Sequence, residues 1–269
     1  MNRIIDYENL SNEIQKWIVN YTNKNNIKTL VVGVSGGIDS AVVSTLCAKT
    51  GINTIAVGMP LKSKPENTKL SKLQLDFLSE LNVQTLEIDL GKTFESFEKS
   101  IPFLFSNELA SANSKSRLRM TTLYHIASSV NGIVVGTGNK VEDFGVGFFT
   151  KYGDGGVDIS PIADLYKTEV RELGRYLGIP QEIINAAPTD GLWDDDRTDE
   201  QQIGATYDEL EWAMEYGTKK QVYTDKEFKI LETYQKFNKK NNHKMVSIPI
   251  FDLKENEIIW KEELSEQVD

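Results

Sequence analysis

The sequence predicts an α/β fold built on a doubly wound, mostly parallel sheet flanked by helices. Short apolar runs alternate with amphipathic stretches, and a Gly-rich turn joins the first such run to a helix. That first run, Thr29–Val34, is continuous and rich in β-branched residues, which is typical of a strand buried on both faces. At 269 residues we expect a single domain that spans 1–269.

The first half of the chain carries a regular succession of helix and strand signals. Leu10, Ile14, Trp17, Ile18 and Tyr21 recur at helical spacing, so residues 7–22 are expected to form an amphipathic helix. After the first strand, further strands are expected at 54–58, 83–90 and 132–136. Helices are expected between them at 39–49, 66–81, 92–101 and 106–130.

The pattern changes after residue 140. Residues 143–160 are rich in glycine and aromatic residues, and a helix fits 165–177. The segment 185–205 is polar with little periodicity, which is typical of a functional loop. Two more helices, at 206–215 and 224–240, and a short tail at 241–269 are expected to pack on the same domain.

Charge and composition exclude several classes of partner. The net charge of −10 argues against nucleic acid, because phosphate backbones are held by clustered lysine and arginine. No apolar run approaches the roughly 20 residues that span a bilayer, so no membrane partner is expected. The segment Met1–Glu8 has no apolar core, and Cys47 is the single cysteine. A cytoplasmic location is therefore expected.

The loop Gly33–Ser40 is the most informative segment. It lies between a strand and a helix, where glycines let the backbone approach an anion and the helix N-terminus presents unpaired N–H groups. Ser35 and Ser40 add hydroxyl donors, and Asp39 offers a hard oxygen ligand for Mg²⁺. Ile38 and Asp39 stand where a phosphate-transfer loop would carry its lysine, so transfer of the γ-phosphoryl group is not favoured.

This loop resembles the Ser-Gly-Gly-X-Asp-Ser motif of the ATP pyrophosphatases. The resemblance implies an adenine-nucleotide hydrolase-like fold in which the loop grips the leaving pyrophosphate while a nucleophile attacks the α-phosphate. The alternative is an ordinary Gly-rich turn between a strand and a helix.

A second signature narrows the family. It comprises Gly136–Glu142 and the run Gly147–Asp158, preceded by Ser116–Met120 and followed by Ala187–Thr189. Together these segments resemble the ammonia-dependent NAD synthetases over essentially the whole chain. That resemblance implies that ATP adenylates the carboxylate of deamido-NAD and that ammonia then displaces AMP.

The resemblance also implies a role for individual residues. Asp39 and Glu142 would hold Mg²⁺. ATP, as co-substrate, would be bound by Gly33, Val34, Ser35, Gly36, Gly37, Ile38, Asp39, Ser40, Thr137, Lys167 and Thr189. Deamido-NAD would be bound by Arg117, Lys151, Asp158, His243 and Lys244.

The same resemblance implies a homodimer whose dinucleotide site is shared between subunits. It also implies loops near 61–67 and 190–205 that close over the reactants. The apolar face of the helix at 7–22 is a candidate for the dimer interface; the alternative is that this helix covers the sheet.

Simpler interpretations stand beside several of these roles. Glu142 could be an acid that complements a helix N-terminus, and Lys167 and His243 could lie on the surface. For Arg119 we favour a solvated surface charge. For the run Asp194–Asp196 we favour a solvated acidic loop over a metal site.

The chain departs from the commonest bacterial pattern at three places. Ile38 replaces a frequent glutamine, Gly138–Lys140 replaces a more usual Asp-His-Ala, and Met245 replaces a common basic residue. None of these changes removes a phosphate or metal ligand.

Two other functions remain open from the sequence. One is an RNA-modifying ATP pyrophosphatase, which the charge and the single cysteine disfavour. The other is a non-catalytic nucleotide-binding module, which would not need both Asp39 and Glu142. Free ammonia is the expected nitrogen donor, because Cys47 lies in an apolar stretch and is expected to be a buried hydrophobe rather than a nucleophile.

Overall fold

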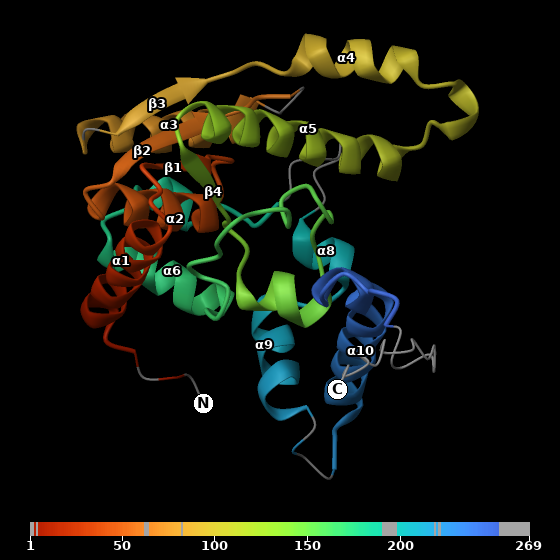
Figure 1. Cartoon of the computed structure of the whole chain (residues 1–269). Coiled ribbons are helices and arrows are strands. Elements are labelled where there is room, and N and C mark those ends of the chain that lie inside the picture. Colours follow the sequence, from red (N-terminus) through yellow and green to blue (C-terminus); the bar gives the residue numbers. More distant parts are fainter. Residues whose placement is uncertain are drawn as a thin grey trace, which may run out of the picture.

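One parallel sheet forms the centre of the protein in its computed structural model (Figure 1). The structure describes residues 3, 5–61, 65–81, 83–189, 198–217, 219 and 222–252. The sheet has four strands in the order β3-β2-β1-β4. They are β1 (Thr29–Gly33), β2 (Asn53–Gly58), β3 (Gln84–Glu87) and β4 (Gly132–Val135). The register places Val31 beside Ile55 on one side and beside Val134 on the other.

The strands alternate with helices along the chain. Within the first half these are α1 (Tyr7–Lys24), α2 (Ile38–Lys49), α3 (Pro65–Glu80), α4 (Gly91–Ser100) and α5 (Glu108–Ser129), with a short 3-10 turn, η1 (Phe103–Phe105). The second half contains a π-helix, η2 (Val141–Val146), and then α6 (Lys167–Tyr176), α7 (Gln181–Ile184), α8 (Asp199–Ile203), α9 (Tyr207–Tyr216) and α10 (Asp225–Met245).

Helices cover both faces of the sheet because the strand residues are apolar on both. Leu30 and Val32 of β1 face a core built with α1, α2, α3, α6 and α7. Val31, between them, faces a second core that Phe94 of α4 and Leu123 of α5 complete. This alternation is the period of a strand, and burial on both faces explains the unbroken apolar run. The doubly wound, parallel arrangement predicted from the sequence is confirmed.

The order of the strands places a crevice beside β1. The chain runs from β1 outward through β2 to β3, and then crosses back to add β4 on the other side of β1. The loops that leave β1 and β4 therefore diverge at the carboxyl end of the sheet, where open α/β sheets bind ligands. Helices α9 and α10 lie below this end in Figure 1, with η2 between them and the sheet.

Side-chain caps explain where several helices begin. Asp6 accepts a hydrogen bond from the backbone of Asn9 at the start of α1, and Asn107 does the same for Ala110 at the start of α5. Thr198, Thr206 and Thr224 each form a reciprocal capping box that starts α8, α9 and α10.

Three sequence-based expectations need correction. The polar segment 185–205 contains a helix, α8, in its last part, and residues 190–197 with Asp194–Asp196 lie outside the described residues. The last helix continues to Met245 instead of ending at residue 240. The third strand, β3, is shorter than the expected 83–90: it pairs with β2 over four residues at the edge of the sheet, and residues 88 and 90 continue as a loop that still donates to Gly58 and Pro60. Within the described ranges, no helix is both long and apolar enough to cross a membrane.

The apolar face of α1 packs inside the chain. Ile14 and Ile18 are buried in the core with α2 and α6, and Leu10 and Tyr21 pack against its margin. Trp17 is 46% exposed. Helix α1 therefore packs on α2 and α6, and a role of its exposed Trp17 in a dimer interface stays a prediction.

Candidate active site

A cavity of about 690 Å³ opens at the carboxyl ends of β1 and β4. Its walls come from the loop after β1, the loop after β4, the middle of α5, the turn after η2 and the last turns of α10. A volume of this size suits one nucleotide-sized ligand. The crevice expected from the strand order is therefore a cavity lined by residues that are far apart in the sequence.

The loop after β1 is held in shape by its own serines. The hydroxyls of Ser35 and Ser40 lie 3.1 Å apart, and Ser35 Oγ also accepts a hydrogen bond from the backbone N–H of Gly37 at 3.2 Å. Ser40 Oγ donates to the carbonyl of Gly37 at 2.9 Å. Gly36 has φ +93°, a conformation that side chains disfavour. The loop is thus preformed around the N-terminus of α2, which is suited to bind phosphate.

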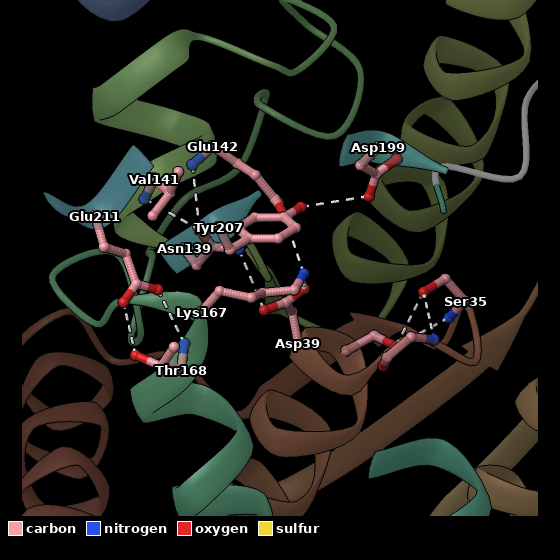
Figure 2. A network of polar contacts seen from close by, with 12 residues as sticks. Ser35, Asp39, Asn139, Val141, Glu142, Lys167, Thr168, Asp199, Tyr207 and Glu211 are labelled. Carbon is pink, nitrogen blue, oxygen red and sulfur yellow. Dashed lines mark hydrogen bonds and ion pairs between the residues drawn. The ribbon is translucent and has the colours of Figure 1, made fainter. Parts of the chain in front are cut away.

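Two carboxylates meet at one lysine on the floor of the cavity. Lys167 Nζ, at the start of α6, lies 2.5 Å from Oδ2 of Asp39 and 3.0 Å from Oε1 of Glu142 (Figure 2). The side chain of Lys167 is 4% exposed, so its charge is compensated almost entirely by these two acids. The interpretation of Lys167 as a surface residue is therefore wrong, whereas Glu142 does lie in the first turn of a helix, η2.

The pKa values of this group follow from burial and from the shared charge. Desolvation would lower the pKa of Lys167, but the charges of Asp39 and Glu142 outweigh it and raise the pKa above its ordinary value. Burial raises the pKa of Asp39. Burial also acts on Glu142, but Lys167 and the hydroxyl of Tyr207 outweigh it and lower the pKa of Glu142. Glu142 is accordingly the more firmly ionised of the two acids.

Asn139 and Tyr207 complete the surroundings of these acids. Asn139 is fully buried; it donates to Oδ1 of Asp39 at 3.3 Å, and its own oxygen accepts from the backbone of Val141 and Glu142 at the start of η2. The hydroxyl of Tyr207, from α9, donates to Oε1 of Glu142 at 2.5 Å. Figure 2 shows these residues converging from the loops after β1 and β4 and from α6 and α9.

The donor set at this place suits Mg²⁺. Asp39 and Glu142 already converge on one cation, the ammonium of Lys167, beside a loop shaped for phosphate. Among the described residues no group of three His, Cys, Asp or Glu side chains gathers as a metal site. Mg²⁺ needs no such group, because it is usually bound through one or two carboxylates together with phosphate oxygens.

Asp143 brings a further carboxylate to the cavity wall. Burial, together with the negative charges of Glu142, Asp154 and Asp39, raises the pKa of Asp143 to about 8. Its carboxylate lies over Gly138, in space that a larger residue at that position would fill. Gly138, one of the positions where the chain departs from the commonest pattern, therefore makes room for the carboxylate of Asp143.

The turn after η2 forms the opposite wall, and α10 holds it. Lys244 Nζ donates to the carbonyl of Gly147 and, at 2.7 Å, to that of Phe149, and its pKa is lowered by burial. Lys151 Nζ donates to the carbonyl of His243 at 3.0 Å. Arg117 of α5 donates to the carbonyl of Lys151 at 3.2 Å. These basic residues, far apart in sequence, therefore lie on one side of the cavity.

The structure brings together nearly all of the residues singled out from the sequence. Gly33–Ser40, Thr137, Glu142, Lys167 and Thr189 line the cavity, as do Arg117, Lys151, His243 and Lys244. Asp158 is not among the lining residues; its carboxylate accepts from the backbone N–H of Val134 at 2.7 Å and interacts with Tyr124.

Sequence reasoning missed several residues of the site. Arg119, expected to be a solvated surface charge, is partly buried in the cavity wall and donates to the carbonyl of Met59 at 3.2 Å. Its position two residues after Arg117 on a helix gave no signal. Tyr207 was also missed, although the capping box at Thr206 marks the start of its helix. Arg171, one turn after Lys167 on α6, lines the cavity as well.

The parallel sheet with a Gly-rich loop after its first strand is a fold of the ATP pyrophosphatase type, and its cavity is lined by two carboxylates that share a lysine and by several basic side chains. The chain belongs to the NAD synthase family, whose family model matches residues 10–247. The predicted family, its fold and its activity, a carbon–nitrogen ligase that forms NAD, are thereby confirmed.

Similar proteins carry related names. The chain is 44% identical over 199 residues to an NH(3)-dependent NAD(+) synthetase of Mesoplasma florum, covering 73% of this chain and 80% of that protein. It is 38% identical over 242 residues to the corresponding protein of Finegoldia magna, covering 87% and 96%.

Two solved structures share the fold. An NMN synthetase from Francisella tularensis matches with a TM-score of 0.83 and 33% identity, covering 93% of this chain and 100% of that one. An NH3-dependent NAD synthetase from Campylobacter jejuni, in complex with nitrate, matches with a TM-score of 0.73 and 25% identity, covering 92% and 100%.

Proposed function

We propose that this chain catalyses the ATP- and Mg²⁺-dependent amidation of deamido-NAD to NAD with free ammonia. One observation carries the proposal. Asp39 and Glu142 share the buried ammonium of Lys167 at the end of a preformed phosphate loop. Removing pyrophosphate from the α-phosphate needs such an arrangement, because negative charge develops on phosphoryl oxygens beside the loop.

The reaction proceeds in two balanced steps. A carboxylate oxygen of the nicotinate attacks the α-phosphorus of ATP, the bond to the β-phosphate breaks, and pyrophosphate leaves with its electron pair. Ammonia then attacks the carbonyl carbon of the resulting mixed anhydride, AMP leaves, and the new amide loses one proton. Adenylation is needed because a free carboxylate is a poor acceptor for an amine.

The side chains divide this work by charge. Asp39 and Glu142 would hold Mg²⁺, which neutralises charge on the leaving pyrophosphate. Lys167, which donates to both acids, would be free to contact the phosphates if these acids held Mg²⁺ instead. The backbone N–H groups at the N-terminus of α2 would hold phosphate oxygens. Thr137 and Thr189, which also line the cavity, would contact ATP.

Deamido-NAD is proposed to bind along the side of the cavity that carries the basic residues. Arg117, Lys151 and Lys244 would compensate the pyrophosphate bridge and carboxylate of deamido-NAD, with His243 beside them. Asp158 accepts a hydrogen bond from the backbone of β4, and we propose that it supports dinucleotide binding by ordering its own loop. Arg119 joins this set, because it lines the same cavity.

A homodimer in the cytoplasm belongs to the same proposal. Exposed large apolar side chains gather where η1 joins α4 to α5; they include Phe103, 93% exposed, and Leu104, 85% exposed, with Phe105 and Leu109 nearby. In Figure 1 this connection stands beyond the sheet. Leu109 also lines the cavity, so a second subunit bound there would border the dinucleotide site.

A second candidate substrate is the mononucleotide, nicotinate mononucleotide. The similarity to the Francisella tularensis protein, titled an NMN synthetase, favours it. The chemistry at the carboxylate and at ATP would be unchanged, and the two substrates differ only in the part that the basic residues would hold. A cavity of about 690 Å³ could enclose the mononucleotide completely or the larger deamido-NAD in part.

The test is an incubation of the purified chain with ATP, Mg²⁺ and ammonium, with deamido-NAD or the mononucleotide as acceptor. We expect NAD, AMP and pyrophosphate in equal amounts, and a higher kcat/KM for deamido-NAD. Asp39→Asn serves as the matched inactive variant, because it keeps size and loop geometry and removes one charge. ATP that binds without release of pyrophosphate would instead indicate a nucleotide-binding module.

A further inference from the structure

A tyrosine from a separate helix reaches the metal-binding acids. The hydroxyl of Tyr207 lies 2.5 Å from Oε1 of Glu142, and this same oxygen accepts from Lys167 Nζ at 3.0 Å. Two donors on one oxygen fix the plane in which the carboxylate lies. Glu142 is therefore oriented from two sides, by α6 through Lys167 and by α9 through Tyr207.

Burial makes this contact hard to exchange for water. Tyr207 is 1% exposed, and its ring packs with Val141, Val146 and Leu210. Hydrogen bonds to charged groups are strong in such surroundings, and a buried carboxylate that loses a donor is left with the full cost of its desolvation. The ring also lies under Lys167, whose Nζ is 5.0 Å from its centroid.

The same hydroxyl touches the start of α8. Asp199 Oδ2 lies 3.4 Å from it, and the backbone N–H of Tyr207 donates to Glu200 of the same helix at 3.0 Å. Figure 2 shows Tyr207 between Glu142 and Asp199. One side chain thus ties α8 to the acid that binds the metal.

We propose that Tyr207 is a positioning residue for the metal: its hydroxyl holds Glu142 in the orientation that accepts Mg²⁺ when Lys167 withdraws. Lys167 and Tyr207 are the two donors to Oε1. With Lys167 withdrawn, Tyr207 would be the donor that keeps this oxygen from turning away from a bound ion. Metal ligands are commonly oriented by such partners, whose loss typically weakens metal binding by about 10- to 100-fold.

The inference rests on the proposed function only in assuming that ATP binds with Mg²⁺. A purely structural tyrosine would contribute packing and stability without affecting the metal. The two roles differ in one measurable respect: a positioning residue changes the binding of ATP when Mg²⁺ is present and leaves metal-free binding unchanged.

The experiment compares Tyr207→Phe with the unmodified chain. Binding of the α,β-methylene analogue of ATP, which cannot release pyrophosphate, is measured by calorimetry with Mg²⁺ and with a chelator. We expect Tyr207→Phe to weaken binding about tenfold or more with Mg²⁺ and to leave binding in chelator unchanged. In turnover, the Mg²⁺ concentration for half-maximal rate should rise by the same factor.

Tyr166→Phe is the matched control. Tyr166 packs in the same apolar cluster and donates to a glutamate, Glu215, at 2.6 Å, but neither residue lines the cavity. This control should bind the analogue with and without Mg²⁺ as the unmodified chain does. A Mg²⁺ response in Tyr166→Phe equal to that of Tyr207→Phe would overturn the assignment.

A double-variant cycle gives a second readout. Glu142→Gln alone should weaken Mg²⁺-dependent binding, and adding Tyr207→Phe to it should change binding little further, because the hydroxyl then has no carboxylate to hold. Effects that simply add would overturn the proposal, as would equal losses with and without Mg²⁺. If the unmodified chain itself shows no Mg²⁺-dependent binding, the proposed function fails; if it does and Tyr207→Phe matches it, only the role of Tyr207 fails.

Discussion

Asp143 and Gly138 compete for the same space: a Cβ atom on Gly138 would lie 2.0 Å from Oδ2 of Asp143. Real atoms do not approach so closely, so the carboxylate of Asp143 depends on the absence of a side chain at 138. The conflict involves the end of a flexible side chain, and Asp143 can turn away from it.

Because these two residues compete for space, the effects of substituting them on the free energy of unfolding should not add. Gly138→Ala should displace Asp143 and destabilise the protein, while the same change in an Asp143→Ala background should cost less. The difference between the two costs is expected to be about 0.5–3 kcal/mol, the range for residues in contact. Urea denaturation of the two single variants and the double variant measures it. Costs that add within error would mean that the two positions do not interact.

Lys167 is expected to be needed for stability in the absence of metal. Lys167→Met leaves the carboxylates of Asp39 and Glu142 together without their cation, and breaking a buried pair in this way typically costs about 3–5 kcal/mol. Mg²⁺ can replace the lost charge. Thermal denaturation with and without Mg²⁺ should therefore show a larger stabilisation by Mg²⁺ in Lys167→Met than in the unmodified chain.

Lys140→Met is the control for this measurement. Lys140 pairs with Asp164 at 2.9 Å, and Asp164 is largely exposed, so its loss should cost little and create no response to Mg²⁺. An equal Mg²⁺ response in both variants would show that the metal does not act at Asp39 and Glu142.

The oligomeric state should depend on the apolar residues at the connection of α4 and α5. Phe103→Glu places a charge at a side chain that is 93% exposed, so it should leave the fold intact and convert the proposed homodimer to monomer. Trp17→Glu, on a helix whose apolar face already packs inside the chain, should leave the dimer unchanged. Light scattering of both variants checks this. A monomer produced by Trp17→Glu alone would return the interface to α1.

Cys47 should be inert toward thiol reagents. It is completely buried in α2, and burial raises the pKa of its thiol from 9.0 to about 12. The reactive thiolate is therefore scarce in the folded protein at pH 9, whereas the unfolded chain is about half ionised there. Labelling with iodoacetamide at pH 7 and pH 9 should be slow in buffer and fast in urea.

The same shift predicts the sign of a pH effect on stability. Between pH 9 and pH 12 the folded protein retains the thiol proton that the unfolded chain loses, so the contribution of Cys47 to the free energy of unfolding falls as pH rises. Cys47→Ala should lack this part of the alkaline loss. It should also turn over ammonium as the unmodified chain does; turnover with glutamine that disappears in this variant would contradict the assignment of ammonia as donor.

The sheet and its helices could be predicted because their signals are local. In β1, Val31 lies on one face of the sheet and Leu30 and Val32 lie on the other. Because both faces are buried, every position is apolar, and this unbroken apolar run is the local signal that predicts the strand. Helix α8 was not predicted because its segment is polar, although the capping box at Thr198 is a local signal for its start. The π-helix η2 could not be predicted, because its shape depends on Asn139 and on the packing of α9 and α10.

The site was predictable where a motif carries it and unpredictable where distant segments meet. The loop Gly33–Ser40 and the acids Asp39 and Glu142 are parts of recognisable motifs. The contact between Tyr207 and Glu142 joins residues 65 positions apart, and nothing in either local sequence indicates it. Arg119 looked like a surface residue because helical spacing does not report which side of α5 borders a cavity.

The hold that α10 has on the turn after η2 has a consequence for synthesis of the protein. Asn241 and Lys244 donate to the carbonyls of Val146, Gly147 and Phe149, across more than 90 residues of chain. A nascent chain that has emerged from the ribosome only as far as α9 lacks these two donors to the turn. The wall of the cavity that this turn forms can therefore be complete only when the last turn of α10 has left the exit tunnel.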